Sequence, residues 1–211
     1  MTHSLSDPRV DAILSRMFDE AGLDDTRRGP RTWPESAQER ADAMAEIYMP
    51  ISRDGGRLLY SLVRAARPEI VVEFGMSFGI STLFLAAAVR DNGAGHVFTT
   101  ELSAAKIAAA KATFGEAGLD DAITVLEGDA RETLADLDGA VGFALLDGWK
   151  DLCLPVLRVL EPRLRPGTLV VADDVNLVSL EPYLSYVRDP ANGYESVTFP
   201  VGDGMEISCR V

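Results

Sequence analysis

The sequence predicts an α/β fold, with a doubly wound, mostly parallel sheet of seven strands covered by helices on both faces. From residue 69 to residue 188, short runs rich in β-branched residues alternate with helical patterns, which is typical of right-handed βαβ units. The last two runs, "YESVTFP" and "MEISCRV", are joined only by "VGDG", so a hairpin is expected and the last strand should be antiparallel. Helical patterns alone precede residue 69, which adds extra N-terminal helices to this fold.

Three helices are expected in the N-terminal part of the chain. Apolar residues recur at helical spacing through residues 7–22. A second helix should open near Ser36, which with Glu39 has the form of a capping box, and should end before Pro50. The third covers residues 54–66 and stops before a proline.

The rest of the chain contains the sheet and its connecting helices. No repeat, low-complexity segment or linker interrupts it, so a single domain over residues 1–211 is expected, with a helical cap region at 1–50 and the core at 51–211. The expected strands are residues 69–75, 96–101, 122–128, 141–147, 167–174, 194–200 and 205–211, and the expected helices between them are 81–90, 103–118, 131–137, 150–164 and 180–188.

Composition excludes several classes of partner and site. The chain has 20 Lys+Arg against 33 Asp+Glu, and its net charge of −13 argues against nucleic-acid or anionic-membrane binding. Two histidines exclude a multi-histidine metal site, and the two cysteines have no paired spacing and are expected to be reduced. No apolar stretch reaches the roughly 20 residues of a membrane span, and the N-terminus lacks a signal-peptide core, so a cytoplasmic location is expected.

Acidic residues stand at five consecutive strand ends. In open α/β sheets the ligand lies beyond the carboxyl ends of the strands, where all of these side chains should gather. A single acid at such a position is usually a helix N-cap, but five in series predict a site. The acids are Glu73, Glu101, Asp129, Asp147, and Asp173 with Asp174.

A glycine-rich loop follows the first strand. In "VVEFGMSFGIS", Gly75 and Gly79 permit tight turning and close approach of the backbone to a ligand, next to the free N–H groups of a helix start. The spacing fits neither the dinucleotide fingerprint nor a P-loop. Glu101, at the end of the next strand, stands where a carboxylate accepts hydrogen bonds from ribose hydroxyls.

Together these features resemble the class I S-adenosylmethionine-dependent methyltransferases, whose Rossmann-like sheet has seven strands with the last one reversed. An NAD-type Rossmann domain is the alternative. "LLDGWKDLCLP" and "GTLVVADDV" look like the catechol O-methyltransferase branch, which has Asp-x-Trp-Lys-Asp after the fourth strand and Ala-Asp-Asn after the fifth. The resemblance covers residues 49–188, and residues 51–211 would then be the cofactor-binding core.

The resemblance implies roles for individual residues. Asp147, Asp173 and Asp174 would bind Mg²⁺, and because Asp174 replaces the family's asparagine, the added charge leaves Mn²⁺ or Ca²⁺ open. Lys150 would be the catalytic base beside Asp147, with Trp149 as an aromatic wall. The residues expected to bind S-adenosyl-L-methionine are Met49, Ile51, Glu73, Gly75, Ser77, Gly79, Ser81, Glu101, Asp129, Ala130, Asp147 and Trp149.

The implied chemistry is methyl transfer to a hydroxyl of a small aromatic, catechol-like molecule. Such a displacement needs a deprotonated oxygen held close to the methyl carbon, and a divalent cation acidifies and orients a bound hydroxyl. A free lysine has a pKa of about 10.4, which a neighbouring cation and partial burial would lower. Each of these residues could instead have a purely structural role. Trp149 could be part of the hydrophobic core, Lys150 a solvated lysine, and residues 173–174 a helix cap.

Two other functions stay open, a metal-independent O-, N- or C-methyltransferase and a non-catalytic Rossmann-type binding domain. A homodimer is also left open. The sequence departs from animal members in that Gly148 replaces a larger residue and the segment after Arg188 is shorter. No counterpart is found for the glutamate that meets the second catechol hydroxyl.

Overall fold

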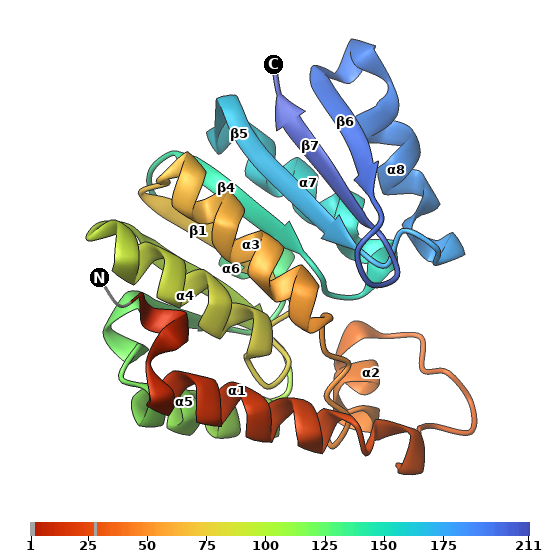
Figure 1. Cartoon of the computed structure of the whole chain (residues 1–211). Coiled ribbons are helices and arrows are strands. Elements are labelled where there is room, and N and C mark those ends of the chain that lie inside the picture. Colours follow the sequence, from red (N-terminus) through yellow and green to blue (C-terminus); the bar gives the residue numbers. More distant parts are fainter. Residues whose placement is uncertain (1–2, 28) are drawn as a thin grey trace.

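The computed structural model describes residues 3–27 and 29–211, which contain one seven-stranded sheet in the order β3-β2-β1-β4-β5-β7-β6 (Figure 1). β7 pairs antiparallel with both of its neighbours, and the other strands all run in one direction. The reversed strand is the last in the chain, as predicted, and it lies between β5 and the edge strand β6. The strands are β1 (Ile70–Phe74), β2 (His96–Glu101), β3 (Ile123–Glu127), β4 (Val141–Leu146), β5 (Leu164–Asp173), β6 (Tyr194–Phe199) and β7 (Met205–Arg210).

The helices begin where the sequence signals predict. The Asp7 side chain caps the first helix, and Ser36 and Glu39 form the expected capping box at the start of the second. Lys150 lies in a short 3₁₀ turn that precedes the seventh helix, and the sixth helix is shorter than predicted. The helices are α1 (Pro8–Ala21), α2 (Ala37–Ala43), α3 (Arg53–Ala66), α4 (Ile80–Asn92), α5 (Ala104–Ala117), α6 (Ala130–Thr133), α7 (Cys153–Leu160) and α8 (Glu181–Arg188).

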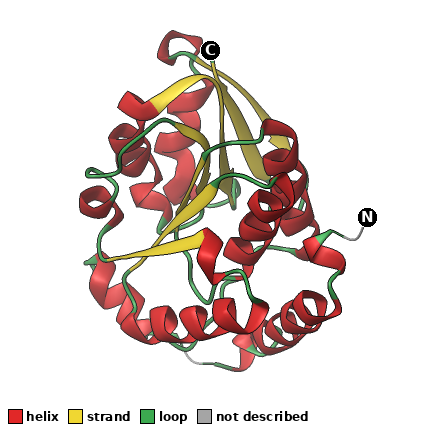
Figure 2. Ribbon diagram, turned by 90° about the vertical axis from the view of Figure 1, so that its left-hand side faces the viewer, coloured by secondary structure: helices red, strands yellow, loops and turns green. Residues whose placement is uncertain are grey.

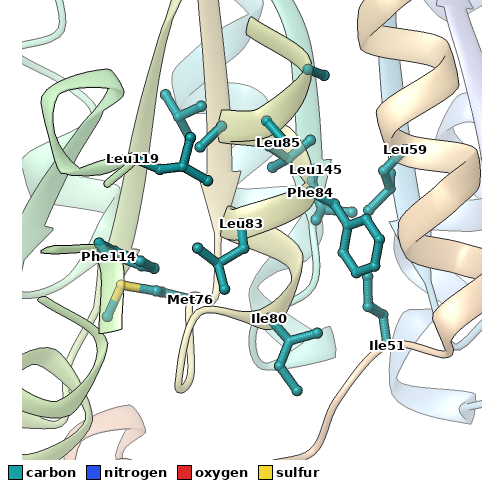
Figure 3. Packing of buried hydrophobic residues seen from close by; sticks show 14 of the residues in the cluster. Ile51, Leu59, Met76, Ile80, Leu83, Phe84, Leu85, Phe114, Leu119 and Leu145 are labelled. Atoms are coloured by element: carbon teal, nitrogen blue, oxygen red, sulfur yellow. The ribbon is translucent and has the colours of Figure 1, made fainter. Parts of the chain in front are cut away.

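The sheet separates two hydrophobic cores, because successive strand residues point to opposite faces. Val71 of β1 and Leu145 of β4 pack with α1, α3, α4 and α5, and Figure 3 shows part of this cluster, including Leu145. Their neighbours Val72 and Leu146 pack with α6, α7 and α8 on the other face. Figure 2 shows helices on both sides of the sheet, as a doubly wound fold requires.

The carboxyl ends of the parallel strands meet along one edge of the sheet. From β1 the chain continues to β2 and β3 on one side, then crosses to β4 on the other side of β1, so the topological switch point lies between β1 and β4. In Figure 1, α2 and the turn between β6 and β7 lie at this end of the strands. Within residues 3–27 and 29–211, none of the helices combines the length and the apolar character needed to cross a bilayer.

Candidate active site

A cavity of about 560 Å³ lies at this switch point, between the strand ends and the N-terminal segment. Twelve of the residues selected from the sequence contribute to its wall. They are Met49, Ile51, Gly75, Ser77, Ser81, Glu101, Asp129, Ala130, Asp147, Trp149, Lys150 and Asp174. Glu73, Gly79 and Asp173 do not contribute to the wall of this cavity.

The loops after β1 and β4 touch each other at two glycines. Gly75 has φ +97°, and a Cβ built on it would lie 2.5 Å from the Cα of Gly148. A Cβ on Gly148 would in turn lie 2.4 Å from the ring of Phe74, which therefore occupies the space of a larger side chain at position 148. Because neither Gly75 nor Gly148 has a side chain, the loop after β1 can pack directly against the backbone of Asp147 and Gly148.

Glu73 lies beneath the cavity and supports its wall. The carboxylate is fully buried, and its Oε2 accepts hydrogen bonds of 2.5 Å from the hydroxyls of Thr82 and Thr99. Burial raises the pKa of Glu73 to about 7, although hydroxyl donors, among them Ser81, oppose the shift. Glu73 thus links β1 to α4 and β2. Gly79, also outside the wall, makes room for the ring of Phe114, 2.5 Å from its virtual Cβ.

Glu101 and Ser77 form the polar side of the cavity. The Oε2 atom of Glu101 accepts a 2.8 Å hydrogen bond from the backbone N–H of Ser77, and Oε1 accepts from the N–H groups of Leu102 and Ser103. These bonds hold Ser77 at φ +49°, which is unusual for a residue other than glycine. The buried Lys106 donates a 3.0 Å bond to Ser77 Oγ and is itself part of the wall.

The segment before α3 closes one side of the cavity. The Tyr48 ring stacks on Phe78 of the glycine loop at 4.1 Å, and its backbone carbonyl accepts a 2.6 Å bond from Ser77 Oγ. The carboxylate of Asp24 accepts the backbone N–H groups of both Tyr48 and Met49. Through these contacts the helical cap fixes the glycine loop.

Trp149 connects the core to α2. Its indole N–H donates to the carbonyl of Ala37 at 3.2 Å, and its ring meets Trp33 edge to face at 5.7 Å. Arg40 of α2 lies over the same indole at 5.9 Å and pairs with Asp151 at 2.8 Å. The indole is therefore held by three contacts and forms an aromatic wall of the cavity.

Asp129 lies at the start of α6, where its carboxylate accepts the N–H of Arg131 at 2.9 Å as a helix cap. The Arg131 guanidinium also pairs with it at 2.5 Å, and these bonds hold the pKa of Asp129 below its usual range. Asp129 thus keeps the cap role that a single acid at a strand end usually has, while still facing the cavity.

Three aspartates gather at the ends of β4 and β5. Carboxylate oxygens of Asp147, Asp173 and Asp174 lie within 4.8 Å of one another. Burial, followed by repulsion from the other two acids, raises the pKa of Asp173 to about 7, and burial raises that of Asp147. Asp174 has φ +59°, a conformation that aspartate and asparagine tolerate better than most residues.

Lys150 lies between two of these carboxylates. Its Nζ is 2.7 Å from Asp147 Oδ1 and 3.0 Å from Asp174 Oδ2, and the side chain is 8% exposed. Burial alone would lower the pKa of Lys150, but the two carboxylates outweigh it and raise the pKa above its usual value. The expectation of a lowered lysine pKa assumed a neighbouring cation, and it stays a prediction for the protein with a cation bound.

Several residues of the wall were not selected from the sequence. Lys106 falls on the buried stripe of α5 with Ile107, Ala110 and Phe114, so its helical position could have indicated its burial. The contacts of Arg40 and Trp33 with Trp149 join segments more than 100 residues apart, and no local pattern predicts them.

Comparisons with known proteins find methyltransferases among the proteins similar to this chain. A family model described as a methyltransferase domain matches residues 72–175. Catechol O-methyltransferase of Sus scrofa is 29% identical over 150 residues, which cover 68% of this chain and 80% of that protein. A protein of Mycobacterium tuberculosis that is described as a probable O-methyltransferase is 28% identical. The match covers 89% of this chain and 82% of that protein. The chain spans 60% of the length of catechol O-methyltransferase B of Danio rerio.

Solved structures share the fold. The O-methyltransferase TomG of Streptomyces achromogenes, in complex with S-adenosylmethionine, has a TM-score of 0.70 at 18% identity, covering 92% of this chain and 98% of that one. A Klebsiella pneumoniae structure described as a putative O-methyltransferase has a TM-score of 0.74 at 20% identity, with 97% and 90% coverage. The sheet order, the cavity at the switch point and these relatives lead to one conclusion. The chain is an S-adenosylmethionine-dependent O-methyltransferase, similar to the class I methyltransferases of the catechol O-methyltransferase-like type.

Proposed function

We propose that this O-methyltransferase methylates a hydroxyl group of a small aromatic, catechol-like molecule with the help of a divalent cation. The observation that carries the proposal is the position of Lys150, which contacts Asp147 and Asp174 inside the cavity that also contains the glycine loop. Relatives named catechol O-methyltransferase support the choice of acceptor.

The polar side of the cavity would bind the methyl donor. Glu101 presents a carboxylate that can accept both ribose hydroxyls, and the backbone at Gly75 and Ser77 can approach closely. Ala130 and Trp149 would enclose the adenine ring of the methyl donor. Met49 and Ile51 would line the opposite wall. S-adenosylmethionine supplies a methyl group on a positively charged sulfur, and these residues hold it for in-line attack.

The three aspartates suit a hard divalent cation. They offer carboxylate oxygens, the ligands that Mg²⁺, Mn²⁺ and Ca²⁺ prefer. When all three aspartates are ionised they carry three negative charges against the one positive charge of Lys150, and a bound cation would neutralise the excess and favour this ionised form. When bound, such a cation would acidify and orient the acceptor hydroxyl.

Lys150 would accept the proton of that hydroxyl. It can do so only in its neutral form, and the charge of Asp147 and Asp174 now favours the ammonium form. Once these carboxylates share their charge with a cation, burial of Lys150 favours the neutral amine. Trp149 and the exposed Trp33 provide apolar surface for the acceptor's ring.

A methyl-transfer screen over catechol, simple phenols and aromatic amines tests the proposal, run with Mg²⁺ and with EDTA. We expect turnover of the catechol with Mg²⁺, its loss in EDTA and its recovery with added Mg²⁺ or Mn²⁺. Full turnover in EDTA would instead support the metal-independent alternative.

A further inference from the structure

A second cavity, of about 340 Å³, adjoins the acid cluster. The end of α1, the segment before α3, the end of β5 and the β6–β7 turn surround it. Its wall shares Pro50, Ile51 and Asp174 with the larger cavity, whereas Asp173 belongs to this wall alone. The acid cluster therefore contributes to both walls, with Asp147 in the wall of the larger cavity, Asp173 in that of the second and Asp174 in both.

Arg53 is the cation in the wall of this second cavity. It is half-buried at the first position of α3, and its guanidinium carbon lies 4.4 Å from the centre of the Phe18 ring. Among the described residues, the Arg53 side chain has no carboxylate within 4.0 Å and makes no hydrogen bond. Nearby arginines are paired, for instance Arg57 with Asp54 at 3.3 Å.

The geometry of Arg53 favours an anion with two oxygens. Phe18 covers a face of the guanidinium, so the N–H groups at its edge remain for a ligand, and this fork matches a carboxylate. The α3 N-terminus, capped by the Ser52 side chain, adds positive potential at the same place. A half-buried cation without a partner is unfavourable, and a bound anion would remove that cost.

The aspartates of the cluster oppose such an anion only weakly once a cation is bound. A divalent cation would neutralise two of the three carboxylate charges, so at most one negative charge would remain at the cluster. Asp203 is the other acid of the wall, and it lies exposed in the β6–β7 turn. Solvent therefore screens Asp203 more strongly than it screens Arg53.

We propose that the second cavity holds a carboxylate group of the methyl acceptor, bound by Arg53. The acceptors are then aromatic hydroxy acids, with the reacting hydroxyl at the acid cluster and the acid group in the second cavity. The inference rests on the proposed function for the position of the hydroxyl, and on Arg53 and Phe18 for the acid group.

Direct binding tests the inference without turnover. Calorimetry with Mg²⁺ and S-adenosylhomocysteine present should show that 3,4-dihydroxybenzoate binds more tightly than catechol. Arg53→Gln should weaken the binding of 3,4-dihydroxybenzoate by about tenfold or more, which is the usual effect of losing a charge-assisted hydrogen-bonded pair. Arg53→Lys, which keeps the charge and loses the fork, should fall between, and Arg57→Gln, on the exposed side of α3, is the matched control.

Kinetics separate this inference from the proposed function. In Arg53→Gln, KM for 3,4-dihydroxybenzoate should rise at least five times more than KM for catechol. Equal effects on both acceptors, or a preference for 3,4-dihydroxybenzylamine that Asp203→Asn abolishes, would overturn the inference while catechol methylation stands. If 3,4-dihydroxybenzoate binds through Arg53 but no hydroxyl is methylated, the proposed function fails, and of the inference only the carboxylate site at Arg53 holds.

Discussion

The Lys150 amine contacts two carboxylates in a nearly closed space, so its protonation depends on what else neutralises them. Asp147, Asp173 and Asp174 could be selected from the sequence because parallel strand ends meet at one edge of the sheet. Lys150 was selected because its segment resembles that of the catechol O-methyltransferase branch. The direction in which the Glu73 side chain points could not be predicted in this way. Glu73 stands at the end of the same kind of strand, yet it points under α4 to Thr82.

Lys150→Ala is expected to lower kcat by roughly 10²–10⁴, the usual range for the loss of a general base. Lys150→Arg should also fail, because arginine stays protonated. Stopped assays at saturating S-adenosylmethionine measure both, with the exposed Lys111→Ala as a control. Normal turnover of Lys150→Ala would leave this lysine a purely electrostatic role.

Glu101→Gln is expected to weaken S-adenosylhomocysteine binding by about 1–3 kcal/mol, because a charged acceptor of hydrogen bonds is lost. Glu127 offers a matched control, since it stands beside Glu101 in the register of β3 but is exposed and paired with Lys111. Calorimetry should show a change for Glu101→Gln and none for Glu127→Gln. Equal affinities in all three proteins would place the ribose elsewhere.

At the scale of elements, the loops after β1 and β4 work as a pair. The capping box at Ser36 and the βαβ alternation could be predicted because both are local patterns. The contact between Gly75 and Gly148 could not be predicted, because it depends on β1 and β4 being neighbours across a crossover. The strand order decides it.

Gly75→Ala should destabilise the protein more than Gly167→Ala does. Both glycines have φ near +90°, at +97° and +90°, so both variants carry a similar backbone penalty of roughly 1–2 kcal/mol. A Cβ at position 75 would also meet Gly148 at 2.5 Å, whereas nothing lies within 4 Å of one at position 167. Thermal unfolding compares them. Equal melting temperatures would show that the loops separate at little cost.

Across the whole molecule, distant segments meet only in the folded chain. Arg40 and Asp151, 111 residues apart, form an ion pair, and Trp149 bonds Ala37 across 112 residues. Such contacts depend on how the helical cap packs against the strand ends. The sequence therefore predicts the helices of the cap, but not the residues of the core that they contact. Buried carboxylates on both sides of the cavity also make the stability of the molecule depend on pH.

Stability without ligands should fall as pH rises from 4.5 to 7. Glu73 titrates near 4.5 when unfolded and near 7 when folded, so protonation favours the folded state. Its contribution is fully present below pH 4.5 and lost by pH 7, a change on the order of 3 kcal/mol. Glu73→Gln should flatten this dependence in urea unfolding at pH 5 and pH 8, and the exposed Glu195→Gln should not. Identical slopes would mean that Glu73 stays ionised when folded.

The edge-to-face pair of Trp33 and Trp149 makes the chain its own optical probe. These are the two tryptophans of the whole sequence, and both line the larger cavity. Light emitted after excitation at the indole band therefore originates entirely from the site, without background from distant indoles. A purine stacked on Trp149, or an aromatic ring beside Trp33, should quench that emission. Ligand titrations can then be followed on the unlabelled protein at low concentration.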